Sequence, residues 1–197
     1  MPLEKPQPRK HIHTRDIQCL GYQRDDGLWD IEGTIMDTKT YSFDNIDRGG
    51  VAAGEPIHHM RVRLTVDDDL VVIKAEASTE AGPYNICGDI TGILQTLEGV
   101  AIAPGWRKEV IRRMGGVKGC THITDLVVGP MAVTAHQTIT SARMRRKAVT
   151  PGSGRPAQID TCHAYASGSP VVKRLWPEIH EEPDRPGAVE RLKAKEV

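Results

Sequence analysis

The stretch HHMRVRLTVDDDLVVIKAEAST, residues 58–79, decides the fold. Its segment MRVRLTV alternates between apolar and polar residues, and this period of two is typical of a half-buried β-strand. The acidic triplet DDD then turns the chain, and LVVIKAEAST returns as a second strand. The stretch therefore predicts a β-hairpin that buries one face and leaves the other face polar.

Another hairpin is predicted earlier in the chain, before residue 40. Asp26-Gly27 is a strong turn signal between two strand-like runs, IQCLGYQR and LWDIEGTIMDTK. Together the two hairpins predict an antiparallel sheet of about four strands. The Gly-rich segment 40–57 connects them, and it either covers a pocket or is a plain surface excursion.

From residue 85 onward the apolar residues follow a helical period instead. Three helices are expected, over 85–100, 103–116 and 120–147. In the second, the residues expected to face inward are Trp106, Val110, Ile111 and Met114, with Gly115-Gly116 as the stop. The third should be kinked at Pro130. Strands followed by helices predict an α+β fold with three helices packed on one face of the sheet.

Composition narrows the class of protein. The 197 residues carry a formal net charge of zero, with 26 basic and 26 acidic side chains, which argues against a nucleic-acid-binding surface. No apolar run approaches the length of about 20 residues that a membrane span needs. The segment MPLEKPQPRKH has no apolar core, so we expect no signal peptide, and we place the protein in the cytoplasm. The four cysteines are widely scattered and are expected to be free thiols, metal ligands or core residues.

The chain is expected to divide into three parts. Residues 1–10 read as a disordered tail and residues 11–149 as a single α+β domain. Residues 150–197 are predicted to be a linker and a C-terminal extension that docks on the domain.

Several potential soft metal ligands fall at predicted element ends, where sites are usually assembled. They are His58, His59, Cys87, Cys120 and His122. Imidazole and thiolate suit zinc, and cysteines also suit iron–sulfur clusters, so a tentative metal set is Cys87, Cys120 and His59. The alternative is that the cysteines are small buried residues and the histidines ordinary strand-end residues.

A polar constellation suits acid–base chemistry. Glu32 lies in a strand beside Gly33, so it faces either a pocket or an exposed strand surface, and Arg15 and His13, one strand away, can pair with it. Asp160 precedes His163 closely enough to fix its tautomer, unless His163 is simply a surface residue. The candidate catalytic residues are His58, His59, Glu32, His163 and Tyr84. The candidate substrate-binding residues are Arg15, Trp29, Tyr165 and His122.

A cysteine nucleophile ranks lowest among these ideas. Cys120 and His122 are two residues apart, and residues with that spacing on a helix point to different sides. We expect Cys120 and His122 instead to line one wall of a hollow between the sheet and the helices, with Cys87 and the two adjacent histidines supplying the other walls.

The segments GEPIHHMRVRLTVDDD, CGDITGILQTLEGV and GCTHITDLVVGPMAVTA together resemble the core of the iron–sulfur scaffold proteins of the SufE/NifU type. In that resemblance, Cys87-Gly88 stands at the second ligand cysteine and Cys120 at the third. The first ligand cysteine has no counterpart in this sequence.

Nearly the whole chain also resembles a bacterial family described as domain of unknown function 2889. The matching runs are TRDIQCLGYQRDDGLWDIEGTIMDTK, GEPIHHMRVRLTVDDD, AGPYNIC, GGVKGCTHITDLV and DTCHAY. This resemblance implies a small-molecule lyase that acts on lignin-derived aromatic compounds and releases a small aldehyde.

The function expected from the sequence is therefore acid–base-assisted cleavage of an aromatic substrate without an organic cofactor, with room for a zinc or iron ion. One alternative is a metal or iron–sulfur module without turnover, and another is a partner-binding adaptor. The expected partner is a small aromatic molecule rather than nucleic acid or membrane, and a homo-oligomer is left open.

Overall fold

The structure is a computed structural model that describes residues 3–146, 156 and 158–182. The chain divides into two compact units, residues 1–148 and 149–197. Four strands open the first unit: β1 (His13–Gln23), β2 (Trp29–Lys39), β3 (Pro56–Val66) and β4 (Val72–Ala81). Seven helical segments follow: η1 (Asn85–Gly88), η2 (Thr91–Leu97), α1 (Trp106–Met114), η3 (Gly116–Lys118), α2 (Thr121–Leu126), η4 (Val127–Met131) and α3 (Ala132–Arg146).

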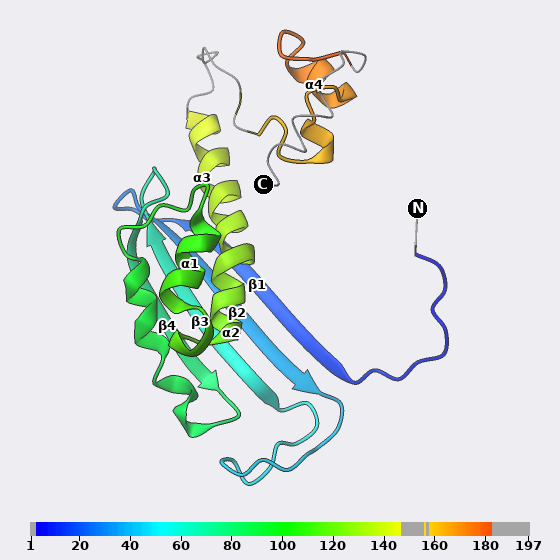
Figure 1. The fold of residues 1–197 in the computed structure, drawn as a ribbon, viewed down its shortest axis with the longest axis vertical. Coiled ribbons are helices and arrows are strands. Elements are labelled where there is room, and N and C mark those ends of the chain that lie inside the picture. The colour runs from blue at the N-terminus through cyan, green and yellow to red at the C-terminus, as the bar shows by residue number, and fades with distance from the viewer. Residues whose placement is uncertain (1–2, 147–155, 157, 183–197) are drawn as a thin grey trace. The chain divides into compact units, whose positions relative to one another are not determined.

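The strands form one antiparallel sheet in the order β1-β2-β3-β4, as the two hairpin signals predicted. Gly27 adopts φ +88° in the first turn, a conformation that a residue without a β-carbon adopts at little cost. The helices all lie on one face of this sheet (Figure 1). The predicted α+β architecture, with an antiparallel four-stranded sheet and helices on one side, is confirmed.

The alternation of each strand decides which residues meet the helices. In β2 every second residue from Trp29 to Asp37 is buried, and the residues between them are only partly covered. The core between sheet and helices includes Ile31, Leu64, Val110 and Met131, each with no exposed surface. The opposite face of the sheet carries charged side chains, among which Glu32 and Arg63 pair.

The helical layer differs from the prediction in three details. Residues 85–100 form the two 3₁₀ segments η1 and η2 instead of one α-helix; Gly88 and Gly92 lie in this stretch, and glycine is a poor residue for a helix interior. In α1, Ile111 is 46% exposed, whereas Trp106, Val110 and Met114 are buried. The predicted break at Pro130 is the π-helical segment η4, because proline has no N–H to donate to the regular ladder.

The second unit is described over residue 156 and residues 158–182. It contains η5 (His163–Tyr165) and α4 (Pro170–Leu175), and the Ser169 side chain caps α4 by accepting a hydrogen bond from the Val172 N–H. The rings of Tyr165 and Trp176 lie 6.0 Å apart, centroid to centroid. Most of the predicted linker, 150–155, lies outside the described residues, and docking of the extension stays a prediction. Among the residues described, none of the helices has the length and apolar character that a bilayer crossing requires.

Two glycines of the sheet allow η4 and α3 to approach it closely. A β-carbon on Gly33 would lie 2.7 Å from Met131 Sδ, and one on Gly21 would lie 2.1 Å from Thr138 Oγ1. The β-branched Thr138 has little freedom to move aside. The contact between β1 and α3 therefore depends on Gly21.

We predict that Gly21→Ala lowers the free energy of unfolding by about 1–3 kcal/mol, because the added methyl group overpacks the β1–α3 contact. Urea unfolding followed by circular dichroism measures this. Gly92→Ala is the matched control, since a β-carbon there meets nothing within 4 Å; its change should stay within about 0.5 kcal/mol. Equal effects of the two substitutions would contradict the proposed close contact.

Candidate functional site

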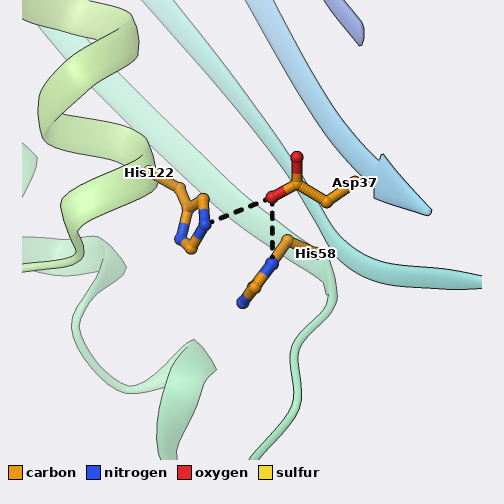
Figure 2. Close-up of side chains that lie close together, drawn as sticks. All are labelled: Asp37, His58 and His122. Atoms are coloured by element: carbon orange, nitrogen blue, oxygen red, sulfur yellow. Dashed lines mark hydrogen bonds and ion pairs between the residues drawn. The ribbon is translucent and has the colours of Figure 1, made fainter. Parts of the chain in front are cut away.

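A buried carboxylate lies where β2 approaches its end. Asp37 continues the buried phase of β2 and is 1% exposed. Antiparallel pairing places Arg15 of β1 and His58 of β3 directly opposite Asp37, so all three share the face that the helices cover. His122, at the start of α2, approaches the same carboxylate from the helical layer (Figure 2).

The contacts of Asp37 are short and use both of its oxygens. Arg15 donates from Nε to Oδ1 at 2.7 Å and from a terminal nitrogen to Oδ2 at 2.8 Å, which is a bidentate ion pair. His58 Nδ1 lies 3.0 Å from Oδ2, and His122 Nε2 lies 3.2 Å from the same oxygen. His13 Nε2 is 3.4 Å from Oδ1 at the exposed rim.

These contacts fix the ionisation of the site. Burial alone would raise the pKa of Asp37, but the hydrogen bonds and charge of Arg15, aided by the two imidazoles, outweigh burial and hold this pKa at about 2. Burial lowers the pKa of His58 and of His122, and the nearby Arg15 charge lowers both further, against the opposing attraction of Asp37. At neutral pH the site thus combines one carboxylate, one guanidinium and two neutral imidazoles.

The carboxylate also selects the tautomer of each ring. An ionised carboxylate only accepts hydrogen bonds, so the ring nitrogens that face Asp37 carry the hydrogens. His58 then holds its proton on Nδ1 and presents the Nε2 lone pair away from Asp37 (Figure 2). His122 Nε2 lies 3.2 Å from Oδ2 of Asp37 in an ion-pair contact, and a hydrogen on Nε2 avoids setting a nitrogen lone pair against the carboxylate, which leaves the lone pair on Nδ1.

The thiol of Cys120 lies next to Nδ1 of His122. Its Sγ is 3.8 Å from His122 Nδ1, so the expectation that these side chains point to different sides is wrong. The reason is the backbone: Cys120 is the N-cap of α2 and is extended, with φ −97° and ψ 130°, so helical spacing does not apply to it.

A metal ion is one possible occupant of the same group. Asp37, His58 and His122 offer donor atoms that all lie within 4.8 Å of one another, and they form the one such group in the described part of the chain. The predicted set Cys87, Cys120 and His59 is therefore not brought together. However, the His58 and His122 rings stack with centroids 3.8 Å apart and planes 30° apart, whereas imidazoles on a tetrahedral zinc spread away from the ion.

The structure separates His58 from its neighbour His59. Successive strand residues point to opposite faces, and His59 pairs with Met36 on the uncovered face. Glu32 is on that face too, where it accepts hydrogen bonds from Arg63 and lines an open hollow of about 270 Å³. The expected pairing of Arg15 and His13 with Glu32 is thus wrong; both lie beside Asp37, on the other face.

Among the described residues of the first unit, Trp29, Tyr84 and Cys87 make no hydrogen bond or ion pair with Asp37. Trp29 is a core residue at the opposite end of β2, 2% exposed, and its Nε1 donates to Asp68. Tyr84 is 57% exposed in the loop after β4, and Cys87 packs against Gly82 in the same region. His163 and Tyr165 belong to the second compact unit, and their roles stay predictions.

Sequence reasoning missed Asp37, the residue around which the site is built. A signal was present, because Asp37 falls in phase with Trp29, Ile31, Gly33 and Ile35 on the buried side of one strand. A carboxylate at a buried position needs partners, which makes it a site candidate.

We predict that Arg15→Ala lowers the free energy of unfolding at pH 7 by about 2 kcal/mol, because Asp37 stays buried and loses two charge-assisted hydrogen bonds. The loss is smaller than for a fully buried pair, since the Arg15 side chain is 39% exposed. Arg63→Ala is the control: it breaks an ion pair on the uncovered face, and we expect a loss below about 1 kcal/mol. Chemical unfolding that ranks Arg63→Ala as the more damaging change would contradict the role assigned to Arg15.

The lowered pKa values of His58 and His122 predict a loss of stability in mild acid. Below the unfolded pKa of about 6.5, the unfolded chain binds protons that these folded histidines do not, so stability falls as pH drops from about 7 to 5. Asp37 adds a further loss from about pH 4 towards its own pKa of about 2. Melting temperatures should therefore decline between pH 7 and 5, and less steeply in the double variant His58→Gln/His122→Gln. Parallel declines in both proteins would rule out these histidines as the cause.

Comparison of the sequence with known proteins identifies the family to which the chain belongs. No curated protein and no solved structure matches the chain, so the resemblance to iron–sulfur scaffolds has no structural support. One family model matches residues 13–137, which include the whole sheet, Asp37, His58 and His122. The chain belongs to this family, described as "Protein of unknown function (DUF2889)".

Proposed function

We propose that this chain is a small-molecule lyase that uses acid–base chemistry at Asp37, His58 and His122. One observation carries the proposal: the buried carboxylate of Asp37 contacts one ring nitrogen of His58 and one of His122, which leaves the second nitrogen of each ring available as a base. A neutral imidazole held by a carboxylate is the usual general base of enzymes near neutral pH.

His58 is the proposed base. Its Nδ1 donates to Asp37, and its side chain is 21% exposed, so a substrate hydroxyl has access to the ring. Removal of that hydroxyl proton by Nε2 allows a carbonyl group to form while the adjacent bond breaks. Asp37 stabilises the resulting imidazolium, and Arg15 keeps Asp37 ionised throughout.

The substrate class follows from the resemblance found in the sequence, which implies aromatic, lignin-derived compounds and release of a small aldehyde. A phenolic substrate that first expels a benzylic leaving group becomes a quinone methide, and this conjugated ring accepts the electron pair of the broken bond as it becomes aromatic again. The reaction then needs no organic cofactor. The imidazolium of His58 can then return its proton to the product. Catalytic roles for Glu32, Tyr84 and His163 remain predictions.

The alternative is a zinc or iron module without turnover. It is supported by the proximity of the donor atoms of Asp37, His58 and His122, which lie within 4.8 Å of one another. Two features favour acid–base chemistry over it: the imidazoles are stacked, and Arg15 places a fixed positive charge on the carboxylate. Elemental analysis of the purified chain separates the two, since one zinc or iron per chain would favour the metal module.

The decisive experiment is an aldehyde-release assay with phenolic aromatic dimers of the lignin type. We predict that the wild-type chain releases free aldehyde and that His58→Gln lowers the rate by about 100-fold or more, the usual contribution of a general base. The pH profile of the rate should lose its acid limb in the same variant.

His59→Gln is the matched comparison, because His59 is the next residue in β3 but lies on the uncovered face. We expect its rate to stay within about twofold of wild type. A loss of activity in His59→Gln with full activity in His58→Gln would overturn the assignment, and the absence of turnover with every dimer would overturn the lyase proposal.

A further inference from the structure

We propose that Cys120 is a nucleophilic thiol that is activated by His122 and Asp37 and forms covalent adducts with small uncharged electrophiles, aldehydes among them. This inference needs only these three side chains and holds whether or not the chain is a lyase.

The three groups form a continuous chain of contacts. Cys120 Sγ lies 3.8 Å from His122 Nδ1, and His122 Nε2 lies 3.2 Å from Asp37 Oδ2. With the hydrogen on Nε2, the tautomer that the adjacent carboxylate favours, the lone pair of Nδ1 faces the thiol and can take its proton. A nucleophile, a base and a group that orients the base are the components of cysteine-based catalytic sites.

The setting of Cys120 differs from that of the other three cysteines. Among the described residues, Cys120 is the cysteine whose sulfur meets an imidazole nitrogen. Burial raises the pKa of Cys19, which makes that thiol a poor nucleophile at neutral pH. Cys120 is half-buried, so a small reagent can reach it, and Cys162 is exposed and serves for comparison.

The proposed reactions balance without an oxidant. With iodoacetamide, the sulfur forms a bond to carbon and iodide leaves, while the thiol proton moves to His122 Nδ1. With an aldehyde, the sulfur adds to the carbonyl carbon and the same proton passes from His122 to the carbonyl oxygen. The product is a reversible hemithioacetal.

The test is the relative alkylation rate of the four cysteines in the native full-length chain. Iodoacetamide is added in limiting amount at pH 7, and peptide mass spectrometry follows each cysteine with time. We expect Cys120 to react about tenfold faster than Cys162 although it is less exposed. In the urea-unfolded chain this ratio should fall to about 1, because the contact with His122 is gone.

His122→Gln should reduce the native ratio to about 1 as well. His136→Gln is its control, because His136 is an exposed residue of α3 outside the site, and it should keep the wild-type ratio. A native ratio of 1 or less, or a full rate in His122→Gln, would overturn the proposal.

Acetaldehyde tests the aldehyde part directly. Preincubation should slow alkylation of Cys120 selectively and reversibly, with no change at Cys162. Equal labelling of Cys120 with and without acetaldehyde would overturn the aldehyde part of the proposal, even if the thiol proves reactive.

Discussion

The buried carboxylate of Asp37 is the constraint on which the rest of the site depends. A charge with 1% exposure must be compensated inside the protein, since a lone buried carboxylate would instead be protonated. The compensation comes from Arg15 on β1 and His58 on β3, which antiparallel pairing sets opposite Asp37, and from His122 at the start of α2. The site therefore exists only if three strands are in register and the helical layer is seated on them. A register shift of one residue in β2 would move Asp37 to the uncovered face, and Arg15, His58 and His122 would lose their common partner.

Arg15 determines what kind of chemistry the group can perform. Because it neutralises Asp37 through two hydrogen bonds, the carboxylate does not need a protonated imidazole as its counter-ion. Both histidines can then stay neutral, and their pKa values are lowered. The ion pair on the other face differs in both respects. Glu32 and Arg63 pair where both side chains are partly exposed, so the pair holds no imidazole and contributes little to the free energy of unfolding.

The fold could be predicted largely from sequence, and the site only in part. Alternation in MRVRLTV and the turn that contains Asp26-Gly27 predict the sheet, because a period of two and a short glycine-containing turn are local properties of the chain. The sequence indicates His58, His122 and Arg15 as candidates but not their common partner Asp37, since the role of Asp37 depends on cross-strand register and on burial by a helix far away in sequence. The position of the Cys120 side chain is missed for a similar reason. Sequence alone does not show that the backbone at Cys120 is still extended, so helical spacing gives the wrong direction for its side chain. Whether Glu32 faced a pocket could not be settled without knowing which face the helices cover.

The proposed cleavage reaction and the proposed thiol reaction use neighbouring proton acceptors, the rings of His58 and His122. The proposed base for a substrate is His58 Nε2 and the proposed base for the Cys120 thiol is His122 Nδ1, so the two reactions use different nitrogen atoms. They do compete electrostatically, because the two rings stack at 3.8 Å and a charge on His58 lowers the pKa of His122. With Arg15 already balancing Asp37, a single added proton gives the group a net positive charge, and a second would set two cations face to face. In the proposed reactions, proton transfer from Cys120 to His122 and proton transfer from a substrate to His58 therefore disfavour each other, because each places a positive charge on one of two rings that lie 3.8 Å apart.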